Sequence, residues 1–207
     1  MKRKFLAVVV GLTLVTISSV SFAQFGGLGA ALGGKNVGSG GVSAEDLVKS
    51  YVGGTKQVMG AEAKLLEAVG LKTNAEKVEF SAKSLTEGPT KASLEEVLQV
   101  QTENNKALAD SMGANKVVLS AESKKTYVAG VVNLVKGIKS YIGMSSDVQG
   151  FKPSITSMGA AAGAAMFVVK SLPDSISSLK NTLKSAIDFA KENKITLPSD
   201  ATSGLPS

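Results

Sequence analysis

Carboxylates are the main side chains that could carry acid–base or metal chemistry in this chain. Its 207 residues contain no His and no Cys. These absences remove imidazole and thiolate metal sites, Ser-His-Asp and Cys-His triads, and imidazole acid–base catalysis. A two-carboxylate site needs no His, so the close acid pairs are the first candidates. They are Glu95 with Glu96, Glu62 with Glu67, and Asp188 with Glu192.

None of these pairs combines an apolar setting with a second acid. Glu95 and Glu96 fall in the first turn of an expected helix, where acids interact favourably with the helix dipole. The other pairs lie beside Lys residues on faces expected to be exposed. Di-metal carboxylate bundles additionally use Glu-x-x-His motifs. We therefore expect no catalytic residues, no metal site, no cofactor and no enzymatic activity.

Three amides form a second candidate group. Gln101, Asn104 and Asn105 interrupt the apolar face of an expected helix where Val or Leu would fit the repeat. They could line a ligand cavity or a water-filled interior, because buried amides need hydrogen-bond partners. The alternative, commoner for such residues, is a wet edge of a bundle or a polar layer that sets helix register.

Gly159 and Gly163 lie four residues apart in a segment without charge between Lys152 and Lys170. Small residues at this spacing let another backbone approach closely. We interpret the segment as a central core helix with close neighbours. A segment that enters a membrane or self-associates is the alternative.

The elements that position these residues are predicted to be helices. Patterns typical of capping boxes begin at Ser43, Thr73 and Ser93. The first apolar stripe keeps its phase across Gly53 and Gly54, so residues 43–69 form either one long helix or two short ones.

Further helices follow in the second half of the chain. One starts near Ser120 and closes at Gly150, and the next runs from Ser154 to about Ser171. Pro173 is expected to end that helix before a final one begins. No strand pairs are visible. The sequence predicts an all-α bundle of five or six helices over residues 43–195, with a loose C-terminal tail over residues 196–207.

The N-terminus has the three parts of a secretory signal peptide. Lys2, Arg3 and Lys4 precede an apolar run over residues 5–15, and Ser21-Phe22-Ala23 suits a signal peptidase. The run is shorter than the roughly 20 residues that span a bilayer. We expect a signal peptide over residues 1–23, cleavage between Ala23 and Gln24, and a periplasmic or secreted protein. Residues 24–42, rich in Gly, would then form a flexible N-terminal arm.

Removing the signal would lower the net charge from +6 to +3. The remaining chain has no Lys/Arg run and few aromatic residues, which makes nucleic acid an unsuitable partner. The expected function is that of an exported, non-enzymatic helical-bundle protein of the bacterial cell envelope that binds a protein or envelope partner. Membrane contact without spanning is compatible with it. The alternative is a periplasmic carrier that holds an apolar small molecule or lipid between its helices.

Overall fold

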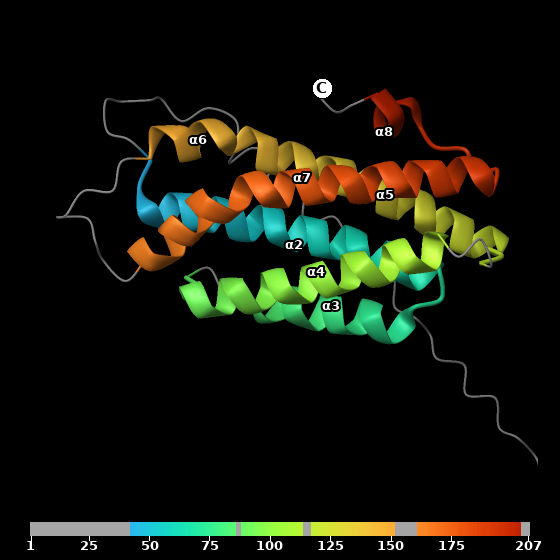
Figure 1. Ribbon diagram of the computed structural model, residues 1–207, viewed down its shortest axis with the longest axis horizontal. Coiled ribbons are helices and arrows are strands. Elements are labelled where there is room, and N and C mark those ends of the chain that lie inside the picture. Colours follow the sequence, from blue (N-terminus) through green and yellow to red (C-terminus); the bar gives the residue numbers. More distant parts are fainter. Residues whose placement is uncertain (1–41, 86–87, 114–116, 152–160, 204–207) are drawn as a thin grey trace, which may run out of the picture. The chain divides into compact units, whose positions relative to one another are not determined.

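The computed structural model describes residues 42–85, 88–113, 117–151 and 161–203, and its regular structure there is helical throughout (Figure 1). This confirms the all-α prediction. The expected signal peptide, its cleavage site between Ala23 and Gln24, and residues 24–41 of the expected arm lie outside the described residues. The described helices are α2 (Ala44–Ala68), α3 (Lys72–Ser84), α4 (Lys91–Gly113), α5 (Ala121–Gly143), α6 (Ser145–Gly150), α7 (Ala162–Glu192) and α8 (Ser199–Ser203).

The most enclosed helix is α2, which contacts α3, α4, α5 and α7. It is one continuous helix through Gly53 and Gly54, and Ser43 caps its start by accepting a hydrogen bond from the Asp46 N–H at 3.1 Å. Its side chains are buried around most of its circumference, including Leu47, Val58, Met59, Leu65 and Leu66. The central position expected for the Ala/Gly-rich segment therefore belongs to α2.

Gly70 ends α2 as the sequence indicates. Its φ of 89° is in the left-handed region, and its N–H donates to the Glu67 carbonyl while the Leu71 N–H donates to the Leu66 carbonyl. This pair of bonds is a Schellman motif. It turns the chain directly into α3.

Two of the three predicted helix starts are displaced. Helix α3 begins at Lys72, before Thr73, because the turn at Gly70 places Leu71 at its N-cap and no side chain caps it. Helix α4 begins at Lys91, and Thr90 rather than Ser93 is the cap, since the Ser93 N–H donates to Thr90 Oγ1 at 3.2 Å. Each proposed cap thus lies inside the first turn of its helix.

The helix predicted to run from Ser120 to Gly150 is divided in two. Ser120 caps α5 as expected, accepting from the Ser123 N–H at 3.0 Å. At the other end the Met144 N–H bonds both the Ser140 and Tyr141 carbonyls at 3.2 Å, which tightens the last turn. Helix α6 follows from Ser145.

Pro173 does not end a helix, contrary to the sequence prediction. It lies inside α7, a single helix of 31 residues. Proline in a helix interior costs about 3 kcal/mol, since it removes one backbone hydrogen bond and crowds the preceding turn. The apolar face stays in phase across it, with Val168, Leu172 and Leu179 all buried. Tertiary packing therefore overrides the local signal. The predicted start at Ser154 lies outside the described residues.

The expected loose tail contains a short helix. Ala201 in α8 is 3% exposed, Leu197 is partly buried, and α8 contacts α5. The prediction of a loose tail over residues 196–207 is therefore wrong for this segment. Burial of Ala201 and Leu197 supplies the apolar contact that holds it.

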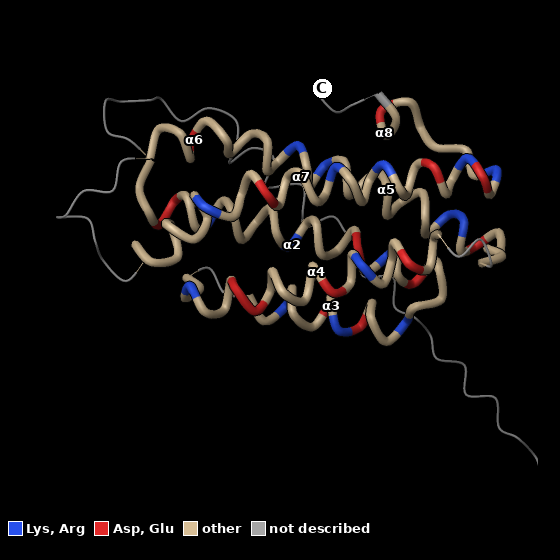
Figure 2. Tube along the Cα trace, in the orientation of Figure 1, with Lys and Arg blue, Asp and Glu red and all other residues tan. Residues whose placement is uncertain are grey.

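Basic and acidic residues are interspersed along the helices (Figure 2). The ion pairs between them, such as Lys77 with Glu103 at 3.0 Å and Lys106 with Asp110 at 2.6 Å, have side chains that are half exposed or more. Such pairs contribute little to stability. None of the described helices has the length and apolar character needed to cross a membrane.

Lys194 has a φ of 52°, and it is the one non-glycine residue with a positive φ in the part of the chain that the structure describes. It follows α7 in a second Schellman motif, where the Ile195 N–H donates to the Ala190 carbonyl at 2.8 Å. A side chain in this conformation destabilises the fold by about 1 kcal/mol.

Lys194→Gly is therefore expected to raise the free energy of unfolding by about 0.5–1 kcal/mol in urea denaturation. A lower stability would show that the Lys194 side chain contributes more than its backbone strain costs.

Candidate functional site

A carboxylic acid is buried in the middle of α2. Glu62 is 1% exposed, which makes the expectation of an exposed face wrong. Its neighbours one helical turn away on either side, Met59 and Leu66, are fully buried. An acid within an apolar 3–4 repeat was the available sequence signal, and the nearby Lys64 obscured it.

Amides of α4 surround this carboxyl. Gln101 Nε2 donates to Glu62 Oε1 at 3.2 Å. Burial raises the pKa of Glu62 to about 8, and the hydrogen bonds from Gln101 and Asn105 only partly oppose that rise. At neutral pH Glu62 is therefore mainly protonated.

Three buried polar atoms near this position have no hydrogen-bond partner among the described residues: Glu62 Oε2, Asn105 Oδ1 and Ser175 Oγ. A protonated carboxyl turns Glu62 Oε2 into a hydrogen-bond donor, while Asn105 Oδ1 is an acceptor and the Ser175 hydroxyl can be either.

A pocket of about 190 Å³ lies between α4 and α7 on this side of the bundle. Ser175 and Gln101, both about 95% buried or more, form part of its wall. Its lining is mostly amides and hydroxyls, with one carboxylate and two leucines: Leu98, Gln101, Thr102, Asn105, Ser171, Asp174, Ser175, Ser178 and Leu179.

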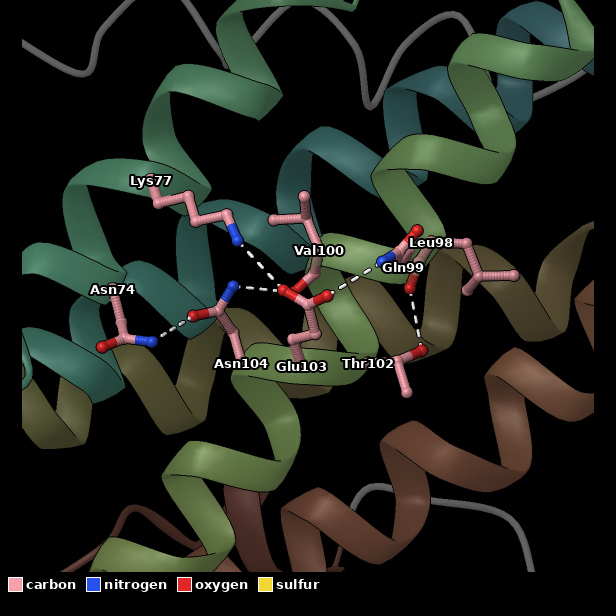
Figure 3. A network of polar contacts seen from close by, with 8 residues as sticks. All are labelled: Asn74, Lys77, Leu98, Gln99, Val100, Thr102, Glu103 and Asn104. Atoms are coloured by element: carbon pink, nitrogen blue, oxygen red, sulfur yellow. Dashed lines mark hydrogen bonds and ion pairs between the residues drawn. The ribbon is translucent and has the colours of Figure 1, made fainter.

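The three amides singled out in the sequence separate into two groups. Gln101 and Asn105 line the pocket. Asn104 instead ties α4 to α3, because its Oδ1 accepts from Asn74 Nδ2 at 2.8 Å and its Nδ2 donates to the Val100 carbonyl at 2.7 Å (Figure 3). Both the oxygen and the nitrogen of its amide have partners, which fits the register-setting interpretation.

The same α3–α4 contact carries an exposed network around Glu103. This carboxylate pairs with Lys77 at 3.0 Å and accepts from Gln99 Nε2 at 3.0 Å (Figure 3). These bonds, that from Lys77 first, lower the pKa of Glu103. The network keeps a charged carboxylate on the surface and leaves Glu62 as the buried acid.

The close helix packing expected at Gly159 and Gly163 can be compared with the structure at Gly163 alone. Gly159 lies outside the described residues. Gly163 is exposed, and a Cβ on it would meet no atom of the described residues within 4 Å.

The tight approach is between α2 and α5. A Cβ on Gly137 would lie 2.7 Å from Val58 Cγ2 and 3.3 Å from the Val58 backbone nitrogen. A Cβ on Gly130 would lie 2.9 Å from the Leu65 side chain and 3.2 Å from its backbone nitrogen. The two contacts are seven residues apart on both helices and run in opposite directions, so α2 and α5 are antiparallel with little space between them.

A second polar cluster lies at the N-terminal end of α2. Tyr141 of α5 stacks on Tyr51 with ring centroids 5.4 Å apart, and its hydroxyl lies 2.7 Å from Thr55 Oγ1. Burial raises the pKa of Tyr141 well above its ordinary value. The hydroxyls here are partnered, so this cluster has a structural role.

The pocket between α4 and α7 can hold a small molecule, and apart from Asp174 its polar side chains are amides and hydroxyls, which do not exchange protons readily near neutral pH. Within the part of the chain that the structure describes, no three potential metal-ligating side chains come together. Searches of protein families, of curated proteins and of solved structures find no match to this chain.

Proposed function

We propose that this chain is an exported, non-enzymatic helical-bundle protein of the bacterial cell envelope that binds a partner there. Export is supported by the three-part N-terminal segment with Ala23 and Gln24 at its cleavage point. Binding is supported by one structural observation above all, the pocket between α4 and α7 with unpartnered polar atoms in or beside its wall.

Glu62 destabilises the fold, and this supports a binding role for the residues around it. An acid that must take up a proton to be buried destabilises the fold relative to a neutral side chain of the same shape. Costly buried polar groups beside a pocket are characteristic of sites under functional constraint. The amides around Glu62 offer hydrogen bonds, and Asp174, the carboxylate that lines the pocket, is exposed rather than held beside Glu62, which favours binding over catalysis.

The alternative of an apolar carrier needs an apolar void between helices. Where α2 meets α5, Gly130 and Gly137 bring the backbones into direct contact. This direct contact leaves no space for a ligand between α2 and α5, which supports the binder over the carrier.

The test is mass spectrometry of the full chain produced in a bacterium with two membranes and purified from the envelope fraction. We expect the mass of the denatured protein to be that of a chain beginning at Gln24. The mass measured under native conditions should be larger by the mass of a retained molecule or partner. Ala23→Leu should block processing, and Ala30→Leu should not. A full-length cytoplasmic product would refute export, and equal native and denatured masses would refute binding.

A further inference from the structure

The pocket between α4 and α7 has the dimensions of a small-molecule site. Its volume of about 190 Å³ corresponds to roughly six water molecules at about 30 Å³ each. This is below the usual range for drug-sized ligands, about 300–1,000 Å³. A ligand enclosed here would therefore be a small molecule of a few non-hydrogen atoms.

The chemistry of the wall specifies what such a molecule should present. Asp174 supplies a carboxylate, and no Lys or Arg lines the pocket. Asn105 Oδ1 and Ser175 Oγ lack partners among the described residues. Carboxylate and amide oxygens accept hydrogen bonds, and a hydroxyl can do so. The amides and hydroxyls of the wall can also donate, so it is the Asp174 carboxylate, with no Lys or Arg in the lining, that favours a hydrogen-bond donor and disfavours an anion.

Ser175 is a specific indication of a ligand. It is 5% exposed and lines the pocket. One turn earlier in α7, Ser171 Oγ donates a hydrogen bond to the Phe167 carbonyl at 2.9 Å. The Ser175 hydroxyl makes no such bond to a backbone carbonyl of its own helix. Buried hydroxyls are ordinarily hydrogen-bonded. The Ser175 hydroxyl can rotate about χ1 to meet a group in the pocket.

We propose that the pocket between α4 and α7 binds a small organic ammonium ion, with its N–H groups directed to Asp174, Ser175 and Asn105 and its carbon atoms against Leu98 and Leu179. The inference rests on the proposed binding function and gives it a ligand class. Charge attraction comes from Asp174 at the exposed side of the pocket, and Ser175 and Asn105 add directional hydrogen bonds.

The test is an NMR titration of the ¹⁵N-labelled protein with ethanolamine at constant ionic strength. We expect saturable shifts concentrated in the pocket-lining residues of α4 and α7. Propionate, an anion of similar size, should cause none, and glycerol, a neutral donor, should bind at least tenfold more weakly. Equal binding of glycerol would refute the ammonium assignment, and unsaturable shifts spread over surface acids would refute the site.

Matched variants locate the binding. Ser175→Ala removes a hydroxyl without a partner, so the fold should be retained and the ethanolamine Kd should rise about tenfold. Asp174→Asn should have a similar effect. Ser177→Ala and Asp188→Asn, at exposed positions on α7 outside the pocket, should leave the Kd unchanged. Unchanged affinity in both pocket variants would refute the proposal.

The two proposals fail separately. Correct processing at Gln24 with a retained molecule, but no ethanolamine binding, would overturn the ammonium site and leave the exported binder. Ethanolamine binding by a chain that remains in the cytoplasm would overturn the proposed location and leave the site.

Discussion

Glu62→Gln is expected to raise the free energy of unfolding at pH 7 by about 2 kcal/mol, as measured by urea denaturation. In the wild type the pKa of Glu62 is about 8 in the folded state against 4.5 as the ordinary value, so folding at pH 7 requires uptake of a proton. That uptake costs about 3 kcal/mol. Gln is neutral at every pH and avoids this cost. The second amide hydrogen of Gln lacks a partner, which lowers the free energy of unfolding by about 1 kcal/mol.

The same pKa difference predicts the direction of the pH dependence. Because the folded-state pKa of Glu62 is raised, its protonated form stabilises the fold fully below pH 4.5, and this stability is lost as the pH rises toward 8. Over that window Glu62 should lower the free energy of unfolding by about 1.4 kcal/mol per pH unit. The Gln variant lacks this slope, so the two stability curves should cross near pH 5, as estimated from that slope.

Glu67→Gln is the matched control, because Glu67 is an exposed acid on the same helix. Its effect should stay within about 0.5 kcal/mol at each pH. If Glu62→Gln were instead destabilising at pH 7, an ionised Glu62 would be held in the fold. The assignment of a protonated Glu62 would then be incorrect.

The sequence predicted the helices more reliably than it predicted which faces are buried. Apolar repeats identified the positions of the long helices, because helical periodicity is a local property. The polarity of Glu62 and the breaking tendency of Pro173 are also local, but their outcomes depend on neighbours far along the chain. Glu62 is enclosed because α4 covers α2, and α7 passes through Pro173 because its buried face continues on both sides.

The candidate site was half predicted for the same reason. Gln101 and Asn105 were visible as amides within an apolar repeat, and the structure places both at the pocket. Ser175 carried no signal, since one serine among several on α7 becomes distinctive only when its burial and its lack of a partner are known. Gly130 and Gly137 gave no signal for a similar reason, because only the partner helix shows which glycines permit contact.

Gly53 and Gly54 provide the sharpest test of the packing, because adjacent residues should respond with opposite signs. A Cβ on Gly54 would lie 2.7 Å from Tyr141 Cε1 and 2.8 Å from Cδ1. The ring cannot move aside easily, since it stacks on Tyr51 and its hydroxyl is bound to Thr55. Gly54→Ala should therefore lower the free energy of unfolding by about 1–2 kcal/mol, with overpacking exceeding the gain in helix propensity.

Gly53→Ala is the matched control on the same turn. A Cβ there would meet no atom of the described residues within 4 Å, so helix propensity alone should raise the free energy of unfolding by up to about 1 kcal/mol. Urea denaturation measures both changes, and the near-ultraviolet circular dichroism of the tyrosines should change only in Gly54→Ala. Equal stabilisation by both alanines would mean that α5 does not approach α2 closely at Tyr141. Opposite signs would establish that Gly54, one of the pair at which the sequence allows α2 to divide into two helices, is required for the contact that joins α2 to α5.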